Sequence, residues 1–355
     1  MARLRARGGL ALFLLAPAAA LVGGVGLAAC SASSKLPGSS TTVASPSVPT
    51  TTVASVKVAG TEETGSLSFM GSVSRLAVTA VPDGLESAPP ALPGTPAYRK
   101  TVQIGYRQLG SGKPLVLIQG EAATMDWWSP GLLSELAGHY RVTLFDLPGT
   151  GYSGPASSPV TVDSLADLTA GLISELRIDS PVVLGWGLGG QVALALAERH
   201  PGVVGDLVLA DTGVPTKGSR PLQKPAAALL SSGPPSPLRL APLLFTASER
   251  AAEQSWLSSL EREIPDPMTA AAVAAQSQLE ASFWHHTDLV RGLRSIDQPT
   301  LVVDGTADRV FPPTDAAALA GSIKGAQRYS WNGAGYGALL AEGPHFAQLL
   351  EGFTG

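Results

Sequence analysis

The stretch Val182–Ala197 reads VVLGWGLGGQVALALA, and its interpretation decides the fold. An apolar run, a glycine-rich turn and an alanine-rich segment predict a strand, a tight turn and a helix. Gly185, Gly187 and Gly190 satisfy G-x-G-x-x-G, a turn whose backbone N–H groups grip a phosphate. The same letters fit G-x-S-x-G, a turn that presents a serine nucleophile, with Gly187 at the serine position. The rest of the chain has to decide between these two interpretations.

Strand-like and helix-like segments alternate through residues 98–355, which have a suitable length for one domain. Short apolar runs predict strands at 101–110, 114–120, 140–149, 181–187, 205–213 and 298–305. Helical spacing of apolar residues follows at 132–139, 164–177 and 189–201. This order predicts an α/β fold, a doubly wound and mostly parallel sheet with helices on both faces.

Residues 214–295 interrupt this alternation with a proline-rich segment followed by helical segments. We expect a helical cap insertion there, lying over the carboxyl ends of the strands where such sheets bind ligands. Packing without any functional role is an equally acceptable interpretation of the insertion.

A dinucleotide site is the remote alternative for the glycine-rich turn. Asp211 follows the last glycine by about twenty residues, the spacing of an acid that binds a ribose. However, such a turn normally opens its domain, and three predicted strands precede this one. Asp211 also has an ordinary role available, since an acid at a strand end often caps the next turn.

Five motifs, in order, resemble those of the α/β-hydrolase fold superfamily, in particular its esterase- and lipase-like members. Residues 114–128 resemble the strand and oxyanion loop, and FDLPGTGYSG at 145–154 resembles the D-x-P-G-x-G-x-S turn. Residues 183–213 resemble the nucleophile elbow with its helix and next strand. LVVDGTADRVFP at 301–312 and GAGYGALLAEGPHF at 333–346 resemble the segments that supply the triad acid and histidine.

The resemblance implies three triad positions, of which one keeps its residue type. Asp308 stands at the acid position, Gly187 at the nucleophile and Tyr336 at the histidine, while Gln119 replaces the usual histidine of the oxyanion loop. Glycine has no side chain, and a phenol with a pKa of about 10 is a poor base near neutrality. These vestigial positions predict that Ser-His-Asp hydrolysis has been lost.

The remaining groups predict a binding pocket. By family position, the backbone N–H groups of Glu121 and Leu188 are oxyanion-hole donors. Gln119, Trp186 and Trp127 would line a pocket for a small apolar or acyl ligand, although core packing is an alternative for the tryptophans. His285 and His286 have no partners at metal-ligand spacing, so neither a metal site nor a cofactor is expected.

The N-terminus has the layout of a secretory signal, with three arginines before an apolar run. Leu27–Cys30 resembles the lipobox of bacterial lipoproteins, which implies cleavage of residues 1–29 and lipidation of Cys30, with palmitate as one acyl chain. An uncleaved transmembrane anchor is the alternative. We therefore expect an extracytoplasmic protein attached to the bacterial cell membrane through Cys30.

Composition agrees with this location. Cys30 is the only cysteine, so no internal disulfide or catalytic thiol is available.

In residues 31–55, sixteen of 25 residues are Ser, Thr or Pro, which predicts a tether over 30–55. The extension 56–97 has one alternating stretch that predicts a strand or two. Without residues 1–29, 21 basic and 28 acidic residues leave a net charge of −7, which argues against nucleic acid as a partner.

These observations favour a lipid-anchored cell-envelope protein, a pseudo-hydrolase that binds a ligand or a partner. The alternative is an active carboxylic ester hydrolase that uses non-standard residues.

Overall fold

The computed structural model describes residues 72–80, 101–155, 160–215, 224–231, 236–260, 268–284 and 287–355 of the 355-residue chain. The predicted signal peptide, the tether, Cys30, His285 and His286 lie outside these ranges. No helix within the described ranges is both long enough and apolar enough to cross a membrane.

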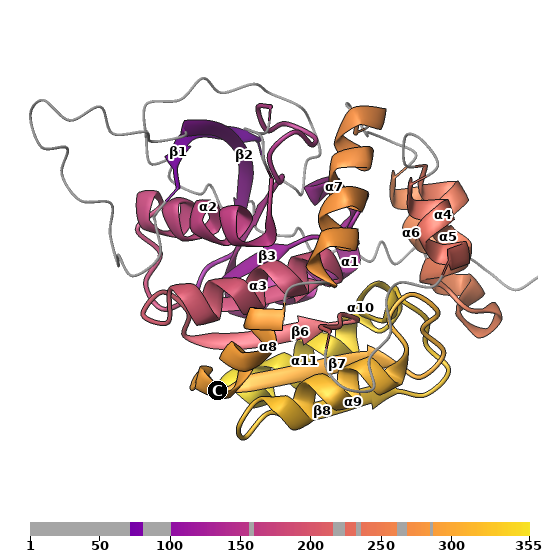
Figure 1. The fold of residues 1–355 in the computed structure, drawn as a ribbon. Coiled ribbons are helices and arrows are strands. Elements are labelled where there is room, and N and C mark those ends of the chain that lie inside the picture. The colour runs from indigo at the N-terminus through magenta and orange to yellow at the C-terminus, as the bar shows by residue number, and fades with distance from the viewer. Residues whose placement is uncertain are drawn as a thin grey trace, which may run out of the picture. The chain divides into compact units, whose positions relative to one another are not determined.

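Eight strands form one sheet, in the order β1-β2-β4-β3-β5-β6-β7-β8 (Figure 1). Strand β2 is antiparallel to β1 and β4, and all other neighbours are parallel. The sheet confirms the predicted α/β fold with a mostly parallel sheet. The strands are β1 Ser74–Thr79, β2 Thr101–Leu109, β3 Lys113–Ile118, β4 Tyr140–Phe145, β5 Val182–Trp186, β6 Asp206–Ala210, β7 Thr300–Gly305 and β8 Gln327–Trp331.

Helices cover both faces of the sheet, which explains the unbroken apolar runs of its strands. Within β3, Leu115 and Leu117 join one apolar cluster, while Val116 and Ile118 join the other. The first cluster includes side chains of α1 Pro130–His139 and α11 Gly343–Thr354. The second includes side chains of α2 Val162–Glu175, α3 Leu188–Arg199 and α9 Pro313–Ser322. Successive strand residues therefore pack into opposite layers.

Two strands differ from the six predicted from apolar runs. Strand β8 is an edge strand whose residues Gln327, Arg328 and Tyr329 are exposed, so it carries no apolar signature. Strand β1 lies within the extension 56–97 and pairs with β2 at the opposite edge. Its burial alternates only partly, since Leu76 and Val78 are buried and Ala77 is exposed.

Short helices lie between β6 and β7 in the sequence. They are α4 Lys224–Ser231, α5 Pro237–Leu244, α6 Arg250–Leu260, α7 Ala270–Phe283 and α8 Thr287–Gly292, with 3₁₀ turns η2 Ala247–Glu249 and η3 Leu293–Ser295. Helix α4 packs against α5 and α7, and α5 packs against α6. The remaining short elements are η1 Met125–Trp127 and α10 Ala338–Ala341.

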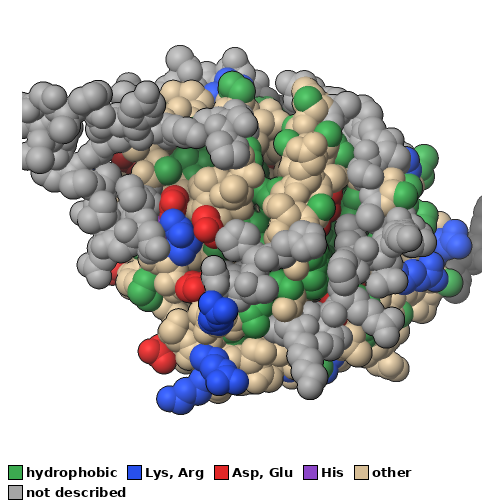
Figure 2. All heavy atoms as spheres, in the orientation of Figure 1, with side chains coloured by type: hydrophobic (Ala, Val, Ile, Leu, Met, Phe, Trp, Pro, Cys, Tyr) green, Lys and Arg blue, Asp and Glu red, His purple; other side chains and the backbone are tan. Residues whose placement is uncertain are grey.

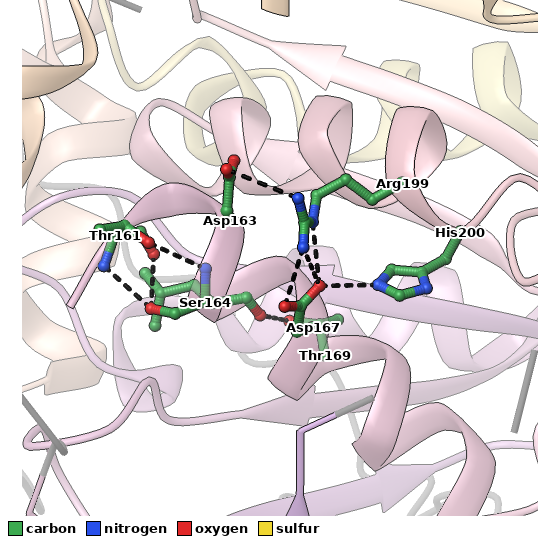
Figure 3. A network of polar contacts seen from close by, with 8 residues as sticks. Thr161, Asp163, Ser164, Asp167, Thr169, Arg199 and His200 are labelled. Carbon is green, nitrogen blue, oxygen red and sulfur yellow. Dashed lines mark hydrogen bonds and ion pairs between the residues drawn. The ribbon is translucent and has the colours of Figure 1, made fainter. Parts of the chain in front are cut away.

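A polar network joins α2 to α3 (Figure 3). The carboxylate of Asp167 accepts two hydrogen bonds of 2.9 Å from the Arg199 guanidinium and lies 2.9 Å from His200 Nε2. Thr161 begins α2 with a capping box, its hydroxyl accepting from the backbone N–H of Ser164. Helix α3, which begins at the glycine-rich turn, is thereby fixed to its neighbour.

Candidate active site

The turn between β5 and α3 has a backbone conformation that favours glycine. Gly187 has φ 55° and ψ −118°, a region that residues with a Cβ rarely adopt. Its N–H donates to the Ala210 carbonyl at 3.0 Å, and its carbonyl accepts from Thr212 Oγ1 at 2.6 Å. The strand–turn–helix is therefore tied to the neighbouring strand β6.

The other turn glycines allow close packing. A Cβ on Gly189 would lie 2.1 Å from the Ile118 carbonyl oxygen, and one on Gly190 would lie 2.6 Å from Thr212 Cγ2. The side chain of Asp211, the candidate ribose ligand, is buried, and its Oδ1 accepts the Gly305 N–H at 3.0 Å. Asp211 thus links the ends of β6 and β7, and although its Oδ2 has no hydrogen-bond partner among the described residues, its burial counts against a role as ribose ligand.

Tyr336 occupies the space directly in front of Gly187. Its side chain is 2% exposed, and its hydroxyl oxygen would lie only 1.9 Å from a Cβ on Gly187. The same oxygen would lie 2.9 Å from a Cβ on Gly120 in the oxyanion loop. The Tyr336 ring packs against Trp186, with centroids 5.0 Å apart, and Trp186 Nε1 donates to the Tyr336 carbonyl at 2.9 Å. The phenol therefore fills the position where a nucleophilic side chain would begin.

Asp308 follows β7 and faces the same buried region. Its Oδ1 accepts the N–H groups of Val310 at 2.6 Å and Phe311 at 3.1 Å, and its Oδ2 has no hydrogen-bond partner among the described residues. Burial raises the pKa of Asp308 well above its usual value. Burial, followed by the charge of Asp308, also raises the pKa of Tyr336. Tyr336 consequently stays protonated near neutral pH and supplies no base.

Helix α7 covers the oxyanion loop through one polar face. Ser277 Oγ donates to Glu121 Oε1 at 2.8 Å, and Gln276 Oε1 accepts the Ala122 N–H at 2.8 Å. One turn later, Glu280 Oε1 accepts from Gln191 Nε2 at 3.0 Å, which ties α7 to the first turn of α3. These contacts were not predicted from sequence. The one available signal was the i, i+4 spacing of Gln276 and Glu280 in an otherwise alanine-rich segment.

The two glutamates of this contact are buried close together. Burial, and next the neighbouring Glu121, raise the pKa of Glu280 to about 7. Burial likewise raises the pKa of Glu121, while its hydrogen bond from Ser277 lowers it. The docking of α7 therefore depends on how many protons this pair holds.

The other predicted pocket residues divide into two groups. Gln119 and Leu188 are buried, and neither amide atom of Gln119 has a hydrogen-bond partner among the described residues. Trp127 instead packs against Trp256 of α6, with ring centroids 5.6 Å apart, and its carbonyl accepts from Trp256 Nε1. The neighbouring Trp128 packs against Trp186, with ring centroids 5.9 Å apart. Trp127 therefore contacts the insertion, and Trp128 contacts the elbow.

The described histidines pair with carboxylates elsewhere. His139 lies near Glu351 and His345 near Glu342, both at exposed positions, whereas His200 is buried against Asp167. Ser153 is structural, since its hydroxyl donates to the Asp146 carbonyl at 2.6 Å and accepts the Gly105 N–H at 3.0 Å. Within the described ranges, no group of three possible metal ligands occurs.

The alpha/beta hydrolase fold family model matches residues 113–342, which span all the site positions described above. The chain belongs to this family. It is 29% identical over 253 residues to a pimeloyl-[acyl-carrier protein] methyl ester esterase of Xanthomonas oryzae, covering 69% of this chain and 96% of that protein. A putative carbamate hydrolase, RutD, of Serratia proteamaculans is 28% identical over 257 residues, covering 70% of this chain and 94% of that protein.

Solved structures of the same fold agree. A thermophilic esterase from Thermogutta terrifontis superposes with a TM-score of 0.60 at 24% identity, covering 79% of this chain and 97% of that one. An enol-lactonase from Burkholderia xenovorans superposes with a TM-score of 0.58 at 22% identity, covering 71% of this chain and 96% of that one. These likenesses establish the fold, and the sequence relatives establish that the chain is related to esterases.

Proposed function

We propose that this chain is a non-hydrolytic member of the α/β-hydrolase fold family that binds a ligand or a partner. One observation carries the proposal: the hydroxyl of buried Tyr336 lies where a side chain at position 187 would begin. Acyl transfer by this fold needs a nucleophile at the elbow and a base within hydrogen-bond reach of it. Gly187 has no side chain, and the raised pKa of Tyr336 removes the phenol as a base.

An active ester hydrolase is the second candidate. Relatives of this chain are named as methyl ester esterases and as a putative carbamate hydrolase, so the comparisons support this candidate more directly than they support a non-hydrolytic protein. An active enzyme would need a nucleophile outside the elbow. Ser153 lies in the turn after β4 and Ser277 lies in α7. Both hydroxyls already donate to protein oxygens.

Labelling with a fluorophosphonate probe separates the two candidates. We expect no covalent adduct on the native chain and no turnover of p-nitrophenyl butyrate above that of heat-denatured protein. A serine esterase processed in parallel is the positive control. An adduct that disappears on substitution of one particular serine by alanine would overturn the non-hydrolytic proposal and identify the nucleophile.

The proposed location is the outer face of the cell membrane. The support is the sequence alone: the arginine-rich start, the apolar run and the residues Leu27–Cys30. Two or more acyl chains on Cys30 give stable anchoring, and the net negative charge of the remaining chain adds no attraction to anionic lipid.

A further inference from the structure

An open pocket of about 450 Å³ lies between the turn after β4 and helix α7. It contains none of the triad or oxyanion-loop positions. Its volume lies in the range of small-molecule sites, about 300–1,000 Å³. The lining residues come from two segments and are Pro148, Gly149, Gly151, Ser153, Pro155, Val160, Met268, Thr269, Ala271, Ala272, Ala275 and Gln276.

The lining of this pocket is mainly apolar. Met268 is buried at 1% exposure, and Ala271, Ala272 and Ala275 present only methyl groups from α7. None of the lining residues carries a charge. Hydrophobic side chains also lie on the surface over and beside α7 in Figure 2. A charged ligand group would lose hydration here without gaining a partner.

Several polar lining oxygens are already hydrogen-bonded within the protein. Ser153 Oγ bonds Asp146 and Gly105, and Thr269 Oγ1 accepts the Ala272 N–H at 3.1 Å. Gln276 Oε1 accepts the Ala122 N–H. The pocket therefore offers mainly apolar contact to a ligand, with little capacity to hydrogen-bond a polar head.

We infer that this pocket binds an uncharged molecule with an alkyl chain, at a site separate from the vestigial triad. The inference deepens the proposed function and rests on it, because the space before Gly187 is filled by Tyr336 and a ligand has to bind elsewhere. Gln276 lines the pocket and also holds the oxyanion loop. A ligand beside α7 consequently contacts the helix that packs on the oxyanion loop.

A photocrosslinking experiment tests the pocket on the full chain in vesicles. The probe is a decanol carrying a diazirine in its chain and an alkyne for detection. We expect crosslinks to residues 148–155, to Val160 and to residues 268–276. Excess 1-decanol should suppress them at least about tenfold more effectively than decanoate at pH 8, because no lining side chain carries a positive charge to offset the lost hydration of a carboxylate.

Two neighbouring alanines of α7 give matched variants. Ala275 lines the pocket and Ala274 does not, although both are exposed. Ala275→Phe should lower crosslinking about tenfold by filling the pocket, while Ala274→Phe should keep it near the native value. Melting temperatures check the fold of both. If phenylalanine unfolds the first variant, Ala275→Leu against Ala274→Leu gives the same comparison.

Crosslinks confined to other peptides would overturn the inference, as would equal labelling of the two variants. The ester turnover assay is independent of this outcome. Hydrolysis by the native chain would contradict the non-hydrolytic proposal and would leave the pocket result standing.

Discussion

Gly187 and Tyr336 depend on each other at the atomic level. The Tyr336 hydroxyl occupies the volume that a Cβ at position 187 would need. Gly187 also has a positive φ, at which the backbone of a residue with a side chain would be strained. A serine placed at 187 would therefore meet both a steric overlap and a strained backbone. None of the described histidines is available to take its proton, because each pairs with a carboxylate elsewhere.

Gly187→Ala tests this dependence. We expect a loss of unfolding free energy of about 2–6 kcal/mol, because strain at positive φ and overpacking each cost about 1–3 kcal/mol. In a Tyr336→Phe background the loss should be smaller by about 1 kcal/mol or more, since the hydroxyl is the atom within 1.9 Å. Urea unfolding of the four chains measures this coupling.

Gly138→Ala is the control for that substitution. Gly138 lies in α1, and a Cβ there would have no neighbour within 4 Å. The change should therefore leave stability unchanged or raise it by up to about 1 kcal/mol. Equal losses at Gly187 in both Tyr336 backgrounds would contradict the steric explanation.

Gly187→Ser alone should not produce an esterase. The protonated Tyr336 cannot accept the serine proton, so p-nitrophenyl butyrate turnover should stay at the background rate at pH 7–8. Measurable turnover by this single variant, absent from Gly187→Ala, would show that another group acts as the base.

At the scale of elements, Glu280 helps to hold α7 on the domain, and burial raises the pKa of this carboxyl to about 7. Glu280 Oε1 accepts bonds from Gln191 and Trp284, and Glu280 Oε2 has no hydrogen-bond partner in the described part of the chain. A protonated carboxyl suits this arrangement, because a buried charge without a cation nearby is costly.

The pH dependence of stability follows from this raised pKa. The folded chain keeps the Glu280 proton up to about pH 7, whereas the unfolded chain releases it near 4.5. Between these values the folded state binds more protons, so the free energy of unfolding falls as pH rises. Glu280→Gln keeps the shape without the titration, and its stability should fall less between pH 5 and 8.

Urea unfolding of the native and Glu280→Gln chains at both pH values measures the difference. Asp146, whose pKa burial also raises to about 7, contributes with the same sign in both chains and cancels in the comparison. Parallel stability profiles would show that Glu280 does not titrate in this range.

The network between α2 and α3 gives a second prediction at this scale. Asp167 binds both Arg199 and buried His200, whereas Asp163 lies 3.6 Å from Arg199 with its side chain 41% exposed. Asp167→Ala should lower stability by about 1–3 kcal/mol because a buried nitrogen loses its partner. Asp163→Ala should cost less than about 0.5 kcal/mol. Thermal unfolding of the two variants checks this ranking, and equal losses would contradict it.

For the whole molecule, Cys30 is the proposed attachment point. Cys30→Ala should abolish incorporation of an alkyne-labelled fatty acid in bacteria and move the protein out of the lipidated membrane fraction. Ser31→Ala, at the neighbouring position, should incorporate the label normally. Continued labelling of Cys30→Ala would place the acyl group on another residue or exclude this form of anchoring.

The layers of this fold follow from the sequence alone. Burial on both faces imposes continuous apolar runs, so strands β2 to β7 were predictable from local composition. The order of the motifs along the chain predicts, by resemblance, that Gly187, Asp308 and Tyr336 are the three triad positions, and this stays a prediction. An exposed edge strand such as β8 lacks the apolar signal, because half of its surroundings is solvent.

What fills the space before Gly187 is set by tertiary packing. The glycine-rich turn and Tyr336 are separated by about 150 residues. No local sequence pattern predicts that the Tyr336 hydroxyl occupies the space in front of Gly187. The same holds for the contacts of Gln276, Ser277 and Glu280 with the oxyanion loop and α3. Periodicity records which face of an element is buried, whereas the partner on that face is set by packing between segments distant in sequence.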